Sequence, residues 1–433
     1  MTSAQTDAAL EWVRGQSAGN APQRPWMATV SYNAIHTPYQ QPPAYPPGFT
    51  WPAGVPEDCG NGAAQHVLSD LMLFSLDQEL GRLLVGLGLA RYESGRLVYR
   101  PESTDTMVVI VGDNGTFIPG VKSPYDPIRS KGTAYQTGIQ APMIVAGPLV
   151  VSPGRTVDHL VDSVDLFQLF GEIADVDVRA VVPSSRALDA QSVLPYLTHA
   201  FQGPVRRNSF TQLGSGLKPA SVKLWPCVIA AGTANLATDI LFNSQGLCED
   251  AGGIWFGPTA SQPTPQYPTS CSIRAAGLFA NMTILPPQVW ALRNDRYKLV
   301  QIDRPSCEST LGEYEFYDLS VRSAANPIGL DLATADLLTN GRPIGLTSAQ
   351  VADLTQLTSE LATLRASELV CHGDGNLDKR VDFDDVVGVG VYGGGASVFD
   401  FSRNGATGIE DLQCVLANYG NDCRRSGSGK ACQ

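Results

Sequence analysis

The sequence predicts an α/β fold in which a mainly parallel sheet lies between helices. Three observations support this prediction. Short apolar runs alternate with segments of helical periodicity through the first half of the chain. One of these runs, "MVVIV" at 107–111, ends in an adjacent Asp and Asn instead of leading into a returning strand. With 433 residues, of which 43% are hydrophobic, the chain can bury a sizeable core and divide into about two or three units.

The first half of the chain supplies the helices and strands of that sheet. A helix is expected first because Ala8, Leu10, Trp12 and Val13 recur at helical spacing. The later segments are assigned by the same test of apolar length and periodicity. The expected elements are a helix over 4–16, a buried strand over 26–32, a long helix over 67–89, strands over 106–112 and 141–148, and a helix over 158–176.

The second half is less regular. Residues 203–283 are rich in Gly, Pro and Ser and are expected to be irregular, and the loop between Cys248 and Cys271 is expected to have little core of its own. A disulfide between Cys248 and Cys271 would staple a small loop there. Residues 289–302 have the pattern of a strand pair with a polar turn. Residues 347–367 are expected to form a helix capped by Thr347 or Ser348.

Charge and cysteine content exclude several classes of protein. The net charge of −12 argues against a protein that binds nucleic-acid phosphates, and no run of 18 apolar residues could span a membrane. None of the nine cysteines forms a Cys-x-x-Cys pair, so a structural zinc site is not expected. Their loop-like surroundings favour disulfides and an oxidising compartment. The first 16 residues do not have the pattern of a signal peptide.

The Asp-Asn-Gly at 113–115 has two interpretations. Asn-Gly is a common hairpin turn, and a turn is the ordinary interpretation of an isolated copy. The residues that follow, up to Pro127, have the composition of a loop and offer no returning strand. The alternative is a ligand site at the carboxyl end of a central strand, where open α/β sheets bind their ligands.

Several short motifs carry a resemblance to a known family. In chain order they are "YNAIHTP" (32–38), "SLDQELGRLL" (75–84), "VGDNG" (111–115), "KGTAYQTGIQAPMIVAGP" (131–148), "SVDLFQLFGEIA" (163–174) and "LRNDRYKLV" (292–300). Together they resemble the sulfatase family of the alkaline-phosphatase-like superfamily over most of residues 4–320. The resemblance implies an alkaline-phosphatase-like α/β domain with a smaller C-terminal α+β sheet subdomain.

The resemblance also implies a set of site residues. Asp113 and Asn114 match the family's calcium ligands, and a hard divalent cation suits carboxylate and amide oxygens. Lys131 matches the family's sulfate-binding lysine, and His36 matches the histidine that contacts the sulfate and assists the leaving oxygen. Taken alone, Lys131 would be a solvated surface lysine and His36 a structural histidine; the order of the motifs favours catalytic and substrate-binding roles for both.

The chain departs from the family pattern at the nucleophile. Sulfatases use a formylglycine made from the first residue of Cys/Ser-x-Pro-x-Arg, and no cysteine or serine of this sequence fits that motif. The paired aspartates that complete the family's calcium site are also absent. The sequence is therefore expected to be the C-terminal portion of a sulfatase, with the formylglycine in upstream sequence.

The last unit contains two copies of a calcium-loop pattern, 26 residues apart. It resembles a dockerin-type repeat pair, small and α-helical, with Asp at position 12 where an EF-hand has Glu. An acidic, glycine-rich tail is the alternative. Cys371 and Cys423 could clasp the pair, with Cys414 as a competing partner. The expected calcium ligands are Asp374, Asn376, Asp378, Arg380 (through its carbonyl), Asp382 and Asp385 in the first loop, and Asp400, Ser402, Asn404, Ala406 and Asp411 in the second.

These inferences define the expected organisation and function. The expected units are a sulfatase α/β portion (1–202), an insertion with the C-terminal subdomain (203–368), dockerin-like repeats (371–423) and a tail (424–433). The expected activity is calcium-dependent hydrolysis of a sulfated small molecule or polysaccharide, by an extracytoplasmic parent protein. The alternatives are a non-catalytic scaffold whose repeats dock a cohesin-like or cell-surface partner, and a phosphodiesterase or phosphatase of the same superfamily.

Overall fold

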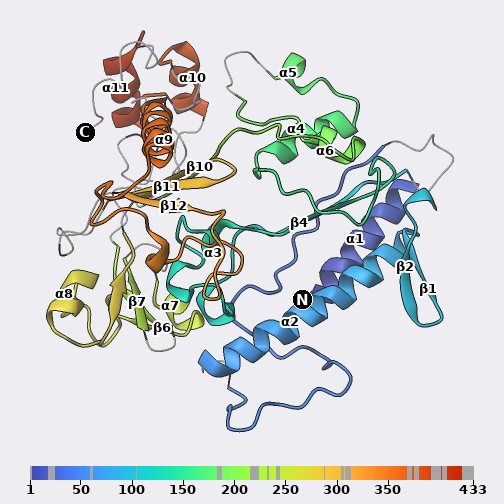
Figure 1. Ribbon diagram of the computed structural model, residues 1–433, viewed down its shortest axis with the longest axis horizontal. Coiled ribbons are helices and arrows are strands. Elements are labelled where there is room, and N and C mark those ends of the chain that lie inside the picture. Colours follow the sequence, from blue (N-terminus) through green and yellow to red (C-terminus); the bar gives the residue numbers. More distant parts are fainter. Residues whose placement is uncertain are drawn as a thin grey trace.

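The computed structural model shows a mixed α/β protein, in which the described strands form four sheets and two long helices lie together (Figure 1). The structure describes residues 2–17, 25–58, 62–103, 105–182, 188–214, 224–231, 234–239, 244–286, 288–303, 307, 314–367, 373–374, 380–391, 401 and 407–421.

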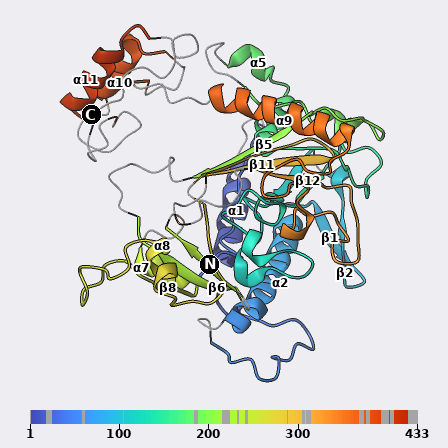
Figure 2. The ribbon, with the colours of Figure 1, turned by 60° about the vertical axis from the view of Figure 1, so that its left-hand side comes forward.

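Two long helices, α1 (Thr2–Ser17) and α2 (Gly62–Gly86), lie side by side in both views (Figures 1 and 2). They correspond to the helices predicted over 4–16 and 67–89. Arg82 ties them together because it binds Asp7 of α1 and Glu79 of its own helix, each at 2.6 Å. A hairpin of β1 (Ala90–Glu93) and β2 (Arg96–Tyr99) follows α2, and the short 3-10 helix η1 (Pro101–Ser103) leads to the next strand.

The predicted strands over 106–112 and 141–148 form β3 (Val108–Val111) and β4 (Met143–Ala146), which pair antiparallel. The prediction of a mainly parallel sheet is therefore wrong for the described strands, among which only β7 and β9 pair in parallel. A parallel crossover needs a substantial connection that returns the chain to the other end of the sheet, usually a helix. The segment between β3 and β4 forms only η2 (Ile118–Gly120), η3 (Pro127–Arg129) and α3 (Gln136–Ile139), and folds back on the end of β3.

The segment 26–32 was expected to be a buried strand, and this expectation is also wrong. It has no strand pairing, and the side chain of Met27 is 62% exposed. A strand is stabilised by its neighbours, and no described strand lies beside this segment. Instead, α1 holds it: Gln5 Nε2 donates to the carbonyl oxygen of Ser31 at 2.6 Å, and Thr6 is hydrogen-bonded to Tyr32 at 3.0 Å.

The helix expected over 158–176 is shorter in the structure, where α4 spans Asp165–Ile173. The fully buried Asp165 anchors its start, because it accepts from the backbone of Asp162 and Gln191 and pairs with Arg206. Two further short helices complete this region, α5 (Val178–Val181) and α6 (Leu194–Thr198), and residues from α4 and α6 share one hydrophobic cluster.

Strands β12-β11-β10-β5, in that order, form a four-stranded antiparallel sheet, called the C-terminal sheet below. Its strands are β5 (Ser209–Gly214), β10 (Gln288–Arg293), β11 (Tyr297–Asp303) and β12 (Tyr314–Asp318), so the predicted strand pair over 289–302 is confirmed as β10 and β11. One face packs on α9 (Ser348–Ser367), the predicted C-terminal helix, which Thr347 caps through the backbone N–H of Gln350. The other face packs against residues 134–135 and against Ala335 of the short η6 (Ala333–Ala335).

The region 203–283 has more regular structure than its composition predicted. It contains a sheet in the order β8-β6-β7-β9 and two short helices. One hydrophobic cluster lies on this sheet and α8, and a second is shared with Ile118 of η2. These elements are β6 (Cys227–Ala231), β7 (Ala234–Thr238), α7 (Gln245–Asp250), β8 (Gly253–Trp255), α8 (Ser270–Ala275) and β9 (Met282–Ile284).

The expected disulfide between Cys248 and Cys271 is wrong. Cys227 on β6 pairs with Cys248 on α7, and Cys271 on α8 pairs with Cys307. The reason is the packing of this region, because Cys227 and Cys248 are both fully buried in the same hydrophobic cluster. The two bonds therefore fix this sheet at two points, one inside it and one near the end of β11.

The C-terminal part contains α10 (Phe383–Val391) and α11 (Ile409–Asn418), which lie together near the C-terminus (Figure 1). Val381, Val389 and Val415 form their shared core. Cys414 is disulfide-bonded, whereas Cys371 and Cys423 lie outside the described residues.

Candidate active site

The loop that follows β3 is joined by backbone hydrogen bonds to the segment that carries Lys131. The N–H of Lys131 donates to the carbonyl oxygen of Thr116 at 2.8 Å. In return, the N–H groups of Gly115 and Thr116 donate to the carbonyl oxygens of Gly138 and Thr137, at 2.9 and 3.1 Å. Asp113 and Asn114 therefore sit one to three residues from a backbone junction with the lysine segment.

Two glycines allow this close approach. A Cβ atom on Gly115 would lie 2.1 Å from the carbonyl oxygen of Thr137, and one on Gly138 would lie 2.4 Å from that of Ser130. Both distances are far inside van der Waals contact, so no other residue fits at either position without moving the backbone. The glycine of the Asp-Asn-Gly motif is thus needed for packing between the two segments. This packing explains why the motif contains a glycine, and a hairpin turn is not needed to explain it.

The side chains at this junction have few contacts with the rest of the described chain. The carboxylate of Asp113 is exposed, and neither it nor the half-buried ammonium of Lys131 forms an ion pair with a described residue. Asn114 Nδ2 donates to the carbonyl oxygen of Gly115 at 3.1 Å, which directs the amide oxygen the other way. A carboxylate and an amide oxygen on adjacent residues suit a hard cation, and they supply two of the six to eight ligands that calcium takes.

The loop that carries His36 is fixed separately. The His36 N–H donates to the carbonyl oxygen of Asn33 at 2.7 Å, and its Nδ1 lies 2.7 Å from the carbonyl oxygen of Thr37. Three residues later, Tyr39 is buried in a cluster with Leu68 of α2, and Phe117 packs against the same cluster. Burial raises the pKa of Tyr39 to about 12. The histidine loop and the loop after β3 thus both pack on α2, while no hydrogen bond joins His36 directly to Asp113 or Lys131 among the described residues.

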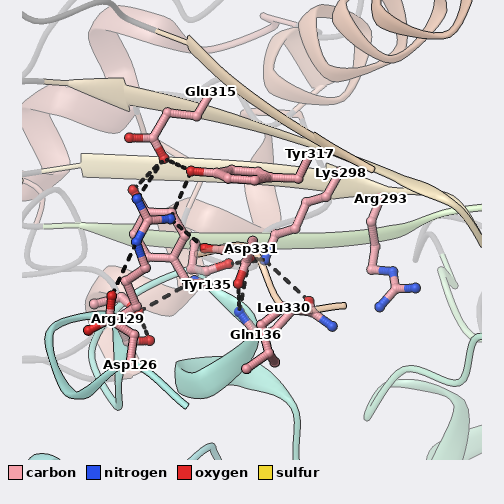
Figure 3. Close-up of polar contacts among 12 residues, drawn as sticks. Asp126, Arg129, Tyr135, Gln136, Arg293, Lys298, Glu315, Tyr317, Leu330 and Asp331 are labelled. Carbon is pink, nitrogen blue, oxygen red and sulfur yellow. Dashed lines mark hydrogen bonds and ion pairs between the residues drawn. The ribbon is translucent and has the colours of Figure 1, made fainter. Parts of the chain in front are cut away.

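A buried polar network holds the lysine segment against the C-terminal sheet (Figure 3). Lys298 of β11 donates to the carbonyl oxygen of Ala134 and to the carboxylate of Asp331, each at 2.6 Å. That carboxylate also accepts from the N–H of Gln136, at 2.9 and 3.0 Å. Because the backbone of residues 134–136 is bound directly, this network fixes the segment just after Lys131.

The rest of the network consists of the contacts of Arg129 (Figure 3). Arg129 donates to the hydroxyl of Tyr317 at 2.8 Å and to the carbonyl oxygen of Asp331 at 2.6 Å, and its guanidinium lies 3.8 Å from the ring centre of Tyr135. The hydroxyls of Tyr135 and Tyr317 both donate to Glu315, at 2.7 Å. Lys131 is therefore flanked on both sides by anchors to the C-terminal sheet.

Sequence reasoning did not identify this network. Burial lowers the pKa of Lys298, and the carboxylate of Asp331 opposes that shift. The available signal was strand parity: Lys298 alternates with Val300 and Ile302, so it occupies a core position of its strand. A lysine at such a position needs a buried acceptor, but its partner is 33 residues away and has no recognisable spacing.

The C-terminal repeats are described in part. Six of the expected ligands, Asn376, Asp378, Asp400, Ser402, Asn404 and Ala406, lie outside the described residues. Asp374, Asp385 and Asp411 are buried, whereas Asp382 is half-buried and Arg380 is exposed. No group of three or more His, Cys, Asp or Glu side chains suited to a metal occurs among the described residues, and no helix there has the length and apolar character needed to cross a bilayer.

Comparison with known proteins supports the sulfatase family for the N-terminal part. Residues 2–176 match the family model described as Sulfatase. A sulfatase of Formosa agariphila is 25% identical over 206 residues, covering 47% of this chain and 34% of that protein. The steryl-sulfatase of Mus musculus is 25% identical over 177 residues, covering 40% and 24%. The matched part of the chain thus spans about a third or less of these relatives' length.

Solved structures resemble the chain more remotely. A phosphonate monoester hydrolase from Silicibacter pomeroyi is 17% identical, with a TM-score of 0.36 over 70% of this chain and 41% of that one. A protein solved with its substrate D-glucosamine-2-N,6-O-disulfate is 16% identical, with a TM-score of 0.37 over 70% and 40%.

Proposed function

We propose that this chain carries part of the active site of a sulfatase, a hydrolase of sulfate esters. The observation that supports this is the junction between the Asp113–Asn114 loop and the Lys131 segment, within the region that matches the sulfatase family. In this proposal the ester is that of a small molecule or a polysaccharide, and the parent protein is extracytoplasmic.

The proposed roles are those that the resemblance to the sulfatase family implies, and the charges of the side chains are compatible with them. Asp113 and Asn114 hold a calcium ion through their side-chain oxygens, and that ion, when bound, withdraws charge from the sulfuryl oxygens. The Lys131 ammonium binds the sulfate, and its fixed backbone keeps the charge in place during the reaction. His36 contacts the sulfate and transfers a proton to the leaving oxygen through Nε2, because its Nδ1 is turned toward the carbonyl oxygen of Thr37.

The nucleophile of this reaction is a formylglycine supplied from outside these 433 residues, which contain no Cys/Ser-x-Pro-x-Arg. The first step of the test is therefore to sequence the DNA upstream of the codon for Met1. An in-frame Cys/Ser-x-Pro-x-Arg motif there is the expected result. A stop codon close upstream without the motif would contradict the proposal and favour the scaffold alternative.

The second step assays the extended protein on 4-nitrophenyl sulfate. Lys131→Met should lower kcat/KM by about 100-fold or more, the usual effect of losing a charge-stabilising group. Lys122→Met is the matched control, since Lys122 lies in the same loop region but is exposed and paired with Asp70. Equal losses in both variants would contradict the role of Lys131. Hydrolysis of a phosphodiester, but not of the sulfate, would favour the phosphodiesterase alternative.

A second candidate function is calcium binding and partner docking by the C-terminal repeats. The supporting observation is that the two repeats contain an equivalent hydrogen bond at the end of each expected calcium loop. Asp385 accepts from the N–H of Asp382 at 2.9 Å, and Asp411 accepts from the N–H of Gly408 at 2.7 Å, so positions 9 and 12 of both expected loops are related alike. Both carboxylates are fully buried, which suits ligands at position 12, the last position of a calcium loop. We propose a cohesin-like or cell-surface partner, testable by pull-down with and without calcium.

A further inference from the structure

One row of side chains crosses the four-stranded sheet on the face that packs against the lysine segment. Arg293 of β10 is paired in register with Ser209 of β5 and with Lys298 of β11, and Lys298 is paired with Tyr317 of β12. Side chains of directly paired residues point to the same face of a sheet. Arg293 therefore points the same way as Lys298, and Figure 3 shows the two side chains leaving the sheet together.

The other members of this row all have partners. Ser209 donates to the carboxylate of Asp162 at 2.8 Å, while Lys298 and Tyr317 belong to the network around residues 129–136. Arg293 lies between these two sets. Its Nε donates to the carbonyl oxygen of Asn294 at 3.2 Å, and its guanidinium forms no ion pair with any residue in the described ranges. In Figure 3 no dashed line reaches it.

A half-buried guanidinium that has no counter-ion among the described residues is costly to bury unless a ligand supplies the opposite charge. Burial lowers the pKa of Arg293, and the charges of Asp295 and Asp331 only oppose that shift. Asp331 is already bound by Lys298 and by the Gln136 N–H, and Asp295 is exposed. The two terminal nitrogens of Arg293 thus present a planar fork, the geometry that best matches a carboxylate, sulfate or phosphate.

We propose that Arg293 binds an anionic oxygen group of a ligand, a sulfate or a carboxylate, between the segment 129–136 and the loop that holds Asp162. This site is separate from Asp113, Asn114, Lys131 and His36. The proposal goes beyond the proposed sulfatase reaction, because binding at Arg293 requires only that the ligand carry an anionic group. A ligand with two anionic groups could occupy both sites at once.

The test observes Arg293 directly, by NMR of arginine side chains in the full chain. The Nε–H signal of Arg293 is assigned by its loss in Arg293→Lys, and sodium sulfate and sodium acetate are titrated against sodium chloride at equal ionic strength. A saturable shift with either oxyanion, and not with chloride, is the expected result. The salt that produces it tells sulfate from carboxylate recognition. Arg296, which is exposed and bound to Asp318 at 2.7 Å, is the internal control and should not shift.

Two results would overturn the proposal. One is an Arg293 signal that responds to sulfate and acetate no more than to chloride. The other is a shift that disappears in Lys131→Met, because the anion would then be bound at the proposed active site and not at a separate one. Neither result bears on whether the extended chain hydrolyses a sulfate ester, so the two proposals fail independently. The titration itself uses the unmodified side chain, so only the assignment of the signal requires Arg293→Lys to fold.

Discussion

Lys298 and Asp331 form an ion pair of 2.6 Å with both side chains almost completely buried, and both bind the backbone of the segment just after Lys131. Removing one partner leaves an uncompensated buried charge, which costs about 3–5 kcal/mol. We expect Lys298→Met to lower the free energy of unfolding by about this amount, measured by urea denaturation. The exposed pair Lys122–Asp70 is the control, and Lys122→Met should cost less than about 1 kcal/mol.

The double variant Lys298→Met/Asp331→Asn sharpens this prediction. If the cost of each single variant comes from the charge it leaves behind, the double variant should lose clearly less than the two single losses combined. Strict additivity would show that the two side chains act independently and would contradict the interpretation of the network as one unit.

Gly115→Ala should displace the loop after β3. Its new Cβ would lie 2.1 Å from the carbonyl oxygen of Thr137, so the loop and the lysine segment must separate. Overpacking of this kind costs about 1–3 kcal/mol, and hydrogen–deuterium exchange should increase at residues 115–116 and 131. Gly246→Ala in α7 is the matched control, because no atom lies within 4 Å of its added Cβ. Unchanged exchange in Gly115→Ala would disprove the close contact.

The disulfide pairing can be checked by peptide mapping without reduction. The expected linked peptides join Cys227 to Cys248 and Cys271 to Cys307. Replacing both Cys227 and Cys248 with alanine should lower stability by about 2–5 kcal/mol, since the bond closes a loop with a sequence separation of 21 and is fully buried. A peptide that links Cys248 to Cys271 would overturn this pairing.

Calcium binding by the C-terminal repeats should depend on position 12 of each loop. Asp385→Asn should weaken calcium binding by about tenfold or more, because the ligand charge sets the affinity of such loops. Asp384→Asn removes an equal charge from the exposed neighbouring position and should have little effect. Calorimetric titration of the full chain measures both. Wild-type protein that takes up no calcium would refute the repeat proposal as a whole.

A pH-dependent effect is expected at Asp239, which accepts hydrogen bonds from Ser270 Oγ and N–H at 2.6 and 3.0 Å. Burial raises its pKa above the usual 3.8, although these hydrogen bonds oppose the shift. A folded state with a raised carboxyl pKa binds more protons than the unfolded state, so stability falls as pH rises from 3.8 through the raised pKa. Asp239→Asn should therefore gain stability relative to wild type as the pH rises from 3.8 through the raised pKa, measured by thermal unfolding at each pH. A constant difference would contradict this.

The elements that sequence could predict are those whose signal is local. Both long helices in the first half, the hairpin over 289–302 and the capped helix after Thr347 follow from apolar spacing or capping residues within one segment. Elements that depend on a distant partner were misjudged. Residues 26–32 have the composition of a buried strand but no described strand beside them, and β3 pairs antiparallel because the chain after it folds back.

In the candidate site too, the sequence could predict the features with a local signal and not those that depend on distant residues. The residue types of the site could be proposed from motifs, and the close approach of Gly115 and Gly138 gives the third residue of Asp-Asn-Gly a structural reason. The supporting residues could not be proposed, because Arg129 and Lys298 reach partners by folding and not by spacing. Arg293 was missed for a related reason. Its unusual feature is that it forms no ion pair within the described chain, which becomes visible only when the neighbouring side chains are in place.

The network around Lys131 also constrains the order in which this protein can be assembled on the ribosome. The hydrogen bonds from Arg129 and Gln136 reach residues 188 to 202 positions further along the chain. During synthesis, the lysine segment therefore emerges long before the strands that bind it. It lacks these contacts until β12 and Asp331 have left the exit tunnel. A nascent chain released before that point lacks the contacts that hold the lysine segment against Lys298, Tyr317 and Asp331.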